Sequence, residues 1–188
     1  GTAREYEYRR LSVLGDIVGG RLQAVCVPDE GLTQYTTPRA EFCNNTRTLH
    51  PGDTVPRTEL TALLYNAGYA RRAQVDGPGQ FSIRGDMVDL YAPDMKLPVR
   101  MEFWGDEIDT MHTFDLATQR REDPIEKIYV SPAREVLFGS PAEAAELLRA
   151  FIKKFRGKKR TALEACLATE LAQLDGGALP VNMDKYLA

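Results

Sequence analysis

Apolar residues recur at helical spacing near both ends of the chain and alternate with polar residues in its middle. Residues 5–18 repeat apolar side chains every three or four positions and predict a helix that a glycine pair ends. Residues 22–27 form a short apolar run typical of a buried strand, and 29–53 show only weak periodicity. A second helix is predicted from Pro56, which suits a first helical turn, to Gly68, which suits the position after a helix.

Between residues 80 and 130 the pattern changes to period two, which predicts strands. The candidate strands are 80–84, 99–104, 108–114 and 125–130, and glycine and proline turns separate them. Short strands with short connections predict an antiparallel sheet. We expect Val99, Met101 and Phe103 to face the core, because alternate side chains of a strand point to opposite faces. The outward face then carries Arg84, Arg100, Glu102 and Trp104.

The last third of the chain predicts two helices. Ser140 and Glu143 form a capping box with Pro141 at the first helical position. A second capping box is predicted at 161–164, and the glycine pair at 176–177 closes the last helix. The predicted fold class is therefore α+β: an antiparallel β-sheet subdomain flanked by helical and α/β pieces.

Composition and charge narrow the function classes. The 188 residues carry 24 Lys and Arg against 27 Asp and Glu, so a globally basic nucleic-acid binder is disfavoured. The three cysteines form no CxxC pair, which argues against a disulfide framework or zinc site and favours a reducing cytoplasm. No apolar run approaches the length of a membrane span, and no membrane partner is expected. Because the chain begins at Gly1 without a methionine, we interpret it as a piece of a longer protein.

The sequence offers little catalytic chemistry. His50 and His112 stand in no nucleophile–base pattern. The Gly157-Lys158 pair is followed by Lys159 and lacks the first glycine of a phosphate-binding loop. We therefore predict no catalytic, cofactor-binding or metal-ligating residue, and a binding module is favoured over an enzyme. An uncharacterised enzyme stays an alternative that would need a pocket with perturbed ionisable groups.

A basic cluster, Lys153, Lys154, Arg156, Lys158, Lys159 and Arg160, lies between the two C-terminal helices. Such a cluster can bind phosphates, so a DNA-binding module using residues 153–160 is an alternative function. The simpler interpretation is that these side chains are solvated and interact favourably with a helix dipole.

Five sequence blocks carry a family resemblance. They are GYARR at 68–72, GQFSIRGDMVDLY at 79–91, LPVRMEFWGDEID at 97–109, TFDLATQR at 113–120 and SPAREV at 131–136. In this order and spacing they resemble the N-terminal UvrB-like module of bacterial transcription-repair coupling factors (Mfd). The excision-repair subunit UvrB shares some of these strings and is the alternative within the wider family.

The resemblance implies a fold and a function. In the family, the full-length protein is an ATP-dependent DNA translocase whose motor lies elsewhere in the chain, and the UvrB-like module recruits UvrA to damage-stalled RNA polymerase. It implies a UvrB domain 2-like UvrA-interaction subdomain over 57–135. It also implies the C-terminal part of a degenerate RecA-like subdomain over 1–56, and a helical return segment of that first domain over 136–188.

By motif position, the partner-binding residues of the family fall on Arg84, Arg100 and Trp104. A phenylalanine is common where this chain has Trp104. Two arginines and an indole on one solvent-facing side of the sheet match the composition of binding hot spots. The competing interpretation is that each arginine pairs with a local carboxylate and that Trp104 packs at a sheet edge.

Overall fold

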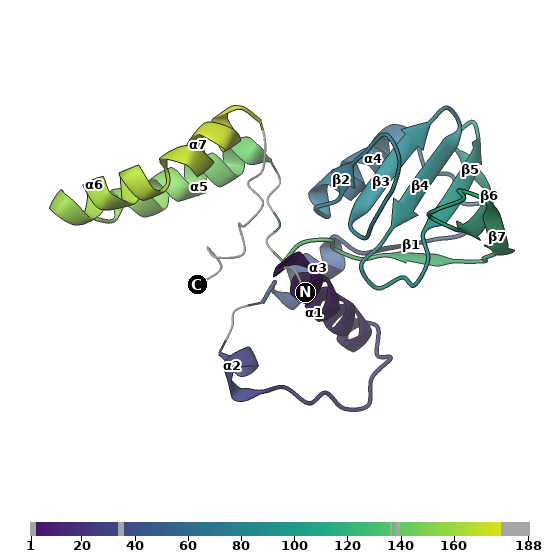
Figure 1. Ribbon diagram of the computed structural model, residues 1–188, viewed down its shortest axis with the longest axis horizontal. Coiled ribbons are helices and arrows are strands. Elements are labelled where there is room, and N and C mark those ends of the chain that lie inside the picture. Colours follow the sequence, from purple (N-terminus) through teal and green to yellow (C-terminus); the bar gives the residue numbers. More distant parts are fainter. Residues whose placement is uncertain (1–2, 34–35, 136, 138–139, 178–188) are drawn as a thin grey trace. The chain divides into compact units, whose positions relative to one another are not determined.

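The computed structural model describes residues 3–33, 36–135, 137 and 140–177. The chain divides into two compact units, Gly1–Leu137 and Phe138–Ala188 (Figure 1). The first unit contains both β-sheets and the second is helical. The architecture is therefore mixed α and β, as the hydrophobic pattern predicts.

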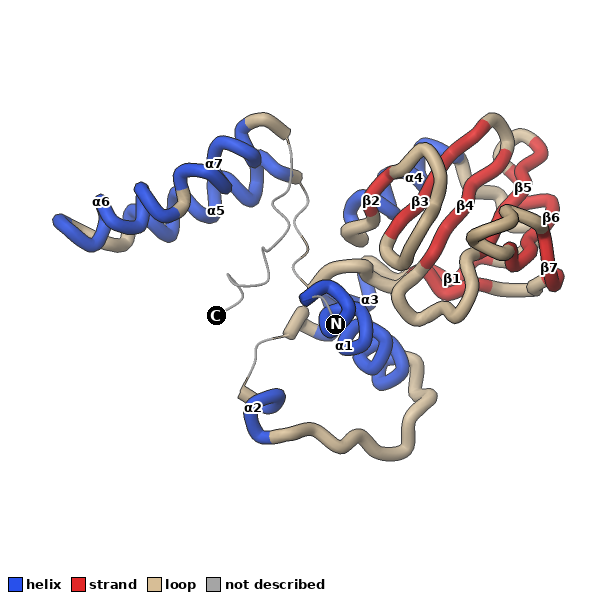
Figure 2. Tube along the Cα trace, viewed as in Figure 1, coloured by secondary structure: helices blue, strands red, loops and turns tan. Residues whose placement is uncertain are grey.

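A six-stranded sheet in the order β2-β3-β4-β5-β6-β7 dominates the first unit (Figure 2). The strands are β2 (Ala70–Arg71), β3 (Gln80–Arg84), β4 (Met87–Tyr91), β5 (Val99–Trp104), β6 (Glu107–Phe114) and β7 (Arg121–Pro124). The prediction of a purely antiparallel sheet is wrong at one edge, because β2 pairs parallel with β3. The chain between these two strands crosses back in a wide loop instead of a hairpin, so both strands run in the same direction. Strands β2, β4 and β7 are not among the predicted strands. All four residues of β7 are exposed and show no alternation.

One face of this sheet packs against α4 (Arg57–Asn66) and forms the core. Leu60 and Leu64 of the helix are buried, and the ring of Tyr65 meets that of Phe81 edge-on at 5.3 Å. Pro56 precedes the helix instead of opening it, whereas Gly68 adopts a left-handed φ of 85° just after it, as predicted. From the sheet, the core receives Phe81, Val88, Leu90, Val99, Met101, Phe103, Ile108 and Met111. The predicted inward face of 99–104 is thereby confirmed.

Helix α1 (Ala3–Val18) confirms the first predicted helix, and α2 (Asp29–Leu32) and α3 (Arg39–Asn44) follow it. Strand β1 (Arg47–Leu49) pairs antiparallel with β8 (Ile128–Val130) in a small second sheet. The predicted strand at 22–27 is wrong, because this segment is an irregular loop whose Val25 and Val27 are 40% and 46% exposed. An apolar run becomes a strand only beside another strand that completes its backbone hydrogen bonds.

The second unit consists of α5 (Pro141–Lys153), α6 (Gly157–Cys166) and α7 (Ala168–Asp175). The Ser140 side chain accepts a hydrogen bond from the Glu143 amide at 3.1 Å, which confirms the first cap. The second predicted cap is wrong: Thr161 lies inside α6, because that helix already begins at Gly157. No helix among the described residues combines the length and apolar character that crossing a membrane requires.

Candidate functional site: the outward face of the sheet

The face opposite the core carries two rows of side chains that run across the strands, and all but one of these side chains are polar. Register places Ser82 opposite Asp89, Asp89 opposite Arg100, and Arg100 opposite His112. A parallel row, two residues nearer the hairpin tips, consists of Arg84, Met87, Glu102 and Thr110. The period of the strands therefore gathers all the predicted site residues on one face.

Asp89 lies at the centre of this face and is only 1% exposed. Its Oδ1 accepts from Arg100 Nε at 2.7 Å, and its Oδ2 accepts from Arg100 Nη2 at 2.9 Å. Oδ2 also accepts from Arg84 Nη2 at 2.6 Å. One carboxylate thus holds two guanidinium groups, the first in the bidentate geometry that makes arginine–carboxylate pairs strong.

Arg100 is buried, which corrects the expectation that it faces solvent. Its side chain is 10% exposed, and its guanidinium stacks 4.6 Å above the Phe114 ring. Nη1 donates to the Gln119 carbonyl at 3.2 Å and Nη2 donates to the Gln119 side-chain oxygen at 3.3 Å. Hydrogen bonding to Asp89 raises the pKa of Arg100, so the guanidinium is charged. Strand β5 directs Arg100 away from the core, as predicted. Asp89 and the loop that contains Gln119 nevertheless cover its side chain.

Arg84 and Trp104 are the predicted site residues that reach the surface. The Arg84 side chain is 40% exposed, and Trp104 is 84% exposed beside the β5–β6 hairpin turn at Gly105. Strand spacing of about 4.8 Å and a rise of about 3.4 Å per residue separate their Cα atoms by about 12 Å. One partner surface can contact both side chains at that separation.

Sequence reasoning missed Asp89 and Gln119. The sequence contained a signal for Asp89, because a two-residue hairpin turn at Gly85-Asp86 fixes the register of the strands on either side. That register sets Arg84 opposite Met87 and Ser82 opposite Asp89, and so places Asp89 on the same face as Arg84. No comparable signal marked Gln119, whose left-handed φ of 60° depends on the conformation of the β6–β7 loop.

The row does not form a catalytic triad, although it contains serine, aspartate and histidine. Asp89 is bonded to arginines, and Arg100 stands between it and His112. Among the described residues, the buried Ser82 Oγ and His112 Nδ1 have no hydrogen-bond partner. A nucleophile needs a base within hydrogen-bonding reach, and Ser82 has none in this row. The described residues also contain no group of three or more side chains able to hold a metal ion.

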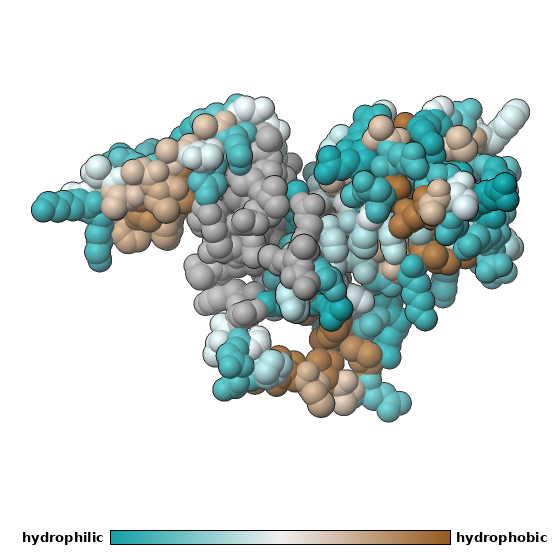
Figure 3. Space-filling model, viewed as in Figure 1, coloured by the Kyte–Doolittle hydropathy of each residue, from teal (hydrophilic) through white to brown (hydrophobic). Residues whose placement is uncertain are grey.

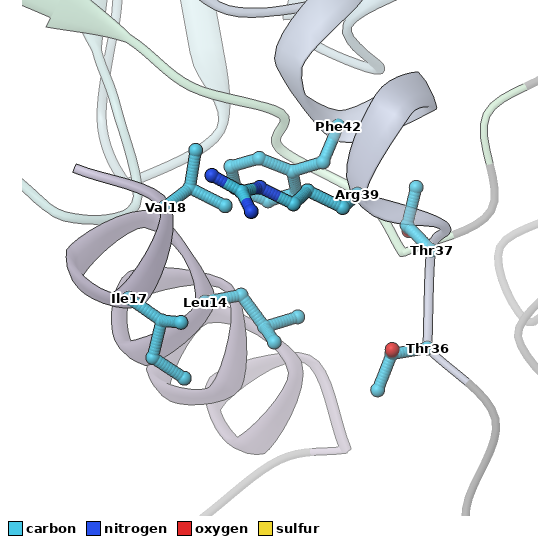
Figure 4. Close-up of a pocket in the computed structure, with 7 residues that line it drawn as sticks. All are labelled: Leu14, Ile17, Val18, Thr36, Thr37, Arg39 and Phe42. Carbon is cyan, nitrogen blue, oxygen red and sulfur yellow. The ribbon is translucent and has the colours of Figure 1, made fainter. Parts of the chain in front are cut away.

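A cavity of about 250 Å³ lies between α1 and α3 (Figure 4). Leu14, Ile17 and Val18 line it from the helix, and Phe42 and Arg39 line it from the other side. Figure 3 shows further hydrophobic surface around the segment between α1 and α2, where Leu22, Val25 and Val27 are exposed. With threonine hydroxyls and one arginine as its polar groups, the cavity offers no acid–base pair for catalysis.

The basic cluster of the second unit is exposed. In the described part of that unit, only Arg160 of the six cations forms an ion pair, with Glu164 at 2.8 Å. The other five are Lys153, Lys154, Arg156, Lys158 and Lys159.

Comparison with known proteins identifies the family to which the sheet region is similar. The UvrB interaction domain family matches residues 48–136, which contain α4, β2 to β8 and all of β1 except Arg47. The chain is homologous to the N-terminal UvrB interaction domain region of the transcription-repair coupling factor.

Two relatives carry this conclusion. The transcription-repair-coupling factor of Bacillus subtilis is 26% identical over 191 residues, which cover 98% of this chain and 16% of the relative. That of Staphylococcus aureus strain MRSA252 is 32% identical over 128 residues, which cover 68% of this chain and 11% of the relative. The chain therefore corresponds to a small part of the length of these proteins.

Proposed function

We propose that this chain is a protein-recognition module that binds UvrA and thereby recruits it to damage-stalled RNA polymerase in nucleotide excision repair. The observation that carries the proposal is the outward sheet face, where an exposed tryptophan and an anchored arginine lie within one partner footprint. Homology to coupling factors supports a protein partner in the Uvr pathway. Transcription-coupled repair takes place in the bacterial cytoplasm, where we place the protein.

The same proposal includes the division of the chain. Residues 57–135 are the UvrB domain 2-like subdomain that meets UvrA, while 1–56 and 136–188 belong to a degenerate RecA-like first domain. ATP-driven translocation, and contacts with RNA polymerase and DNA, reside in other parts of the parent protein. In this proposal the chain itself acts by binding and catalyses no reaction.

The direct test is a binding measurement between this chain and purified UvrA by calorimetry, with a pull-down as a second readout. Saturable binding that Trp104→Ala weakens supports the proposal. Absence of binding by the folded parent chain at micromolar concentrations contradicts it. A fragment of UvrB itself would also bind UvrA, so this assay does not distinguish a coupling factor from UvrB. The similarity of the chain to transcription-repair-coupling factors makes that distinction.

Weak DNA contact through residues 153–160 is a second candidate, favoured by the five exposed cations without an ion pair in the described structure. Counterion release would make such binding fall steeply with salt. A titration with labelled duplex at two salt concentrations tests it.

A further inference from the structure

Most of the hydrogen-bond donors of Arg100 are already engaged within the chain, so few of them are available to a binding partner. Asp89 and Gln119 accept hydrogen bonds from four of the five N–H donors of the Arg100 guanidinium, and the Phe114 ring covers one face of this planar group. Its side chain is 10% exposed. Any effect of this residue on binding must therefore pass through the groups that it holds.

Most of the hydrogen-bond donors of Arg84, in contrast, are available to a binding partner. In the part of the chain that the structure describes, its side chain makes one hydrogen bond, from Nη2 to Asp89 Oδ2. The other donors of the guanidinium remain available, and the side chain is 40% exposed. A free arginine samples many rotamers and loses that entropy on binding, so a single strong anchor lowers the cost of presenting it.

The charges on this face leave one positive charge without a counterpart. Arg84 and Arg100 share the single negative charge of Asp89. The neighbouring carboxylates are engaged elsewhere: Glu102 pairs with Arg121 and accepts from Thr110, and Asp86 pairs with Arg57. The surplus lies at Arg84, because Arg100 is enclosed in the bidentate pair. A partner that supplies one carboxylate would complete the network.

We propose that Asp89 is a positioning residue, which holds the Arg84 guanidinium outward for one carboxylate of the protein partner, and that Arg100 affects binding only by fixing Asp89. This inference rests on the proposed function, because its partner is UvrA. Trp104 contributes its apolar surface independently of Asp89.

A double-mutant cycle tests the proposal with purified UvrA. Asp89→Glu keeps the charge but displaces the carboxylate by one methylene, and Arg100→Lys replaces the fork with a single ammonium. Each is expected to weaken binding by about tenfold in the parent chain and by less than about twofold in an Arg84→Ala background. Asp123→Glu, on an exposed strand, is the matched control and should bind as the parent does. Melting curves show which variants are folded.

The cycle also defines the contrary result. If Arg100→Lys weakens UvrA binding equally in both backgrounds, Arg100 touches the partner and the proposal is wrong. If Asp89→Glu weakens UvrA binding equally in both backgrounds, Asp89 affects the folding of this face and does not act through Arg84, which also contradicts the proposal.

A measurement on the chain without UvrA tests the positioning role of Asp89 separately from the proposed binding of UvrA. Nitrogen-15 NMR of the Arg84 guanidinium should show restricted rotation in the parent chain and free rotation in Asp89→Glu. If Asp89→Glu does not fold, Arg100→Lys serves in its place. A freely rotating Arg84 in the parent overturns the positioning role, whatever UvrA does. A restricted Arg84 in a chain that does not bind UvrA refutes the proposed function while the Asp89 anchor stands.

Discussion

Phe103 and Trp104 are adjacent in the chain, yet Phe103 is 5% exposed and Trp104 is 84% exposed. The pleat of β5 sends them to opposite faces of the sheet. Phe103 packs in the core between the sheet and α4, while Trp104 lies on the outward face. Stability and binding therefore depend on different members of this pair.

Truncation of the two aromatic residues should separate these effects. Phe103→Ala is expected to destabilise the fold by about 3–5 kcal/mol, because it leaves a cavity in the core. Trp104→Ala should cost less than about 1 kcal/mol, since little of its surface is buried. Denaturant unfolding of both variants measures the difference. A larger loss for Trp104→Ala would contradict the assignment of the faces.

The two arginines should also differ in their contribution to stability. Arg100→Ala leaves Asp89 buried without its bidentate partner, and we expect a loss of about 3–5 kcal/mol. Arg84→Ala should cost less than about 1 kcal/mol, because this half-exposed pair is screened by solvent. The double variant Asp89→Leu/Arg100→Met should recover much of the Arg100→Ala loss. Equal melting temperatures for Arg84→Ala and Arg100→Ala would refute the buried network.

Binding of UvrA should depend on the residues that reach the surface. Arg84→Ala and Trp104→Ala are each expected to weaken binding by about 2–4 kcal/mol, as hot-spot residues do. Arg84→Lys should recover part of the loss, because an ammonium cannot form the bidentate contact. Trp104→Phe should retain most of the affinity, since it keeps an aromatic ring.

Calorimetry with purified UvrA measures these affinities, and Lys158→Ala is the control that should bind as the parent does. The hypothesis fails if folded Arg84→Ala and Trp104→Ala chains both bind UvrA with unchanged affinity.

Asp94 should make stability depend on pH. Burial raises the pKa of Asp94 above its ordinary value of 3.8, although Ser131 donates to it and Arg21 lies 3.7 Å away. Asp16 also raises this pKa, and Asp94 in turn raises that of buried Tyr69. A carboxyl group with a raised folded pKa binds its proton more tightly in the folded state. Stability therefore falls as the pH rises from about 3.8 through the folded value.

Asp94→Asn tests this effect, because the amide keeps an acceptor for Ser131 without the buried charge. The variant should be more stable than the parent at neutral pH and equally stable below about pH 3.8. Melting temperatures across this range measure the difference, with the exposed Asp123→Asn as control. A variant that is less stable at pH 7 would show that the Arg21 attraction outweighs burial.

Much of the fold followed from local pattern. Period two over 99–104 determined which side chains enter the core, because alternation is a property of a strand itself. Ser140 and Gly68 marked helix ends correctly, since the bonds they satisfy are local. The motif blocks likewise carried the family resemblance that homology to coupling factors supports. The apolar run at 22–27 failed as a strand, because strand formation needs a neighbour that the sequence does not display.

The sequence by itself determined that Arg84, Arg100 and Trp104 share one face of the sheet. Only the tertiary structure decided that Arg100 lies beneath this face, held by Asp89 and Gln119, while Arg84 and Trp104 remain exposed. Strand parity sets the direction of a side chain, but its burial depends on residues far away in the chain. The register of β4 against β5 brings Asp89 to Arg100, and the conformation of the β6–β7 loop brings Gln119 over it. These are long-range interactions, and no local pattern contains them.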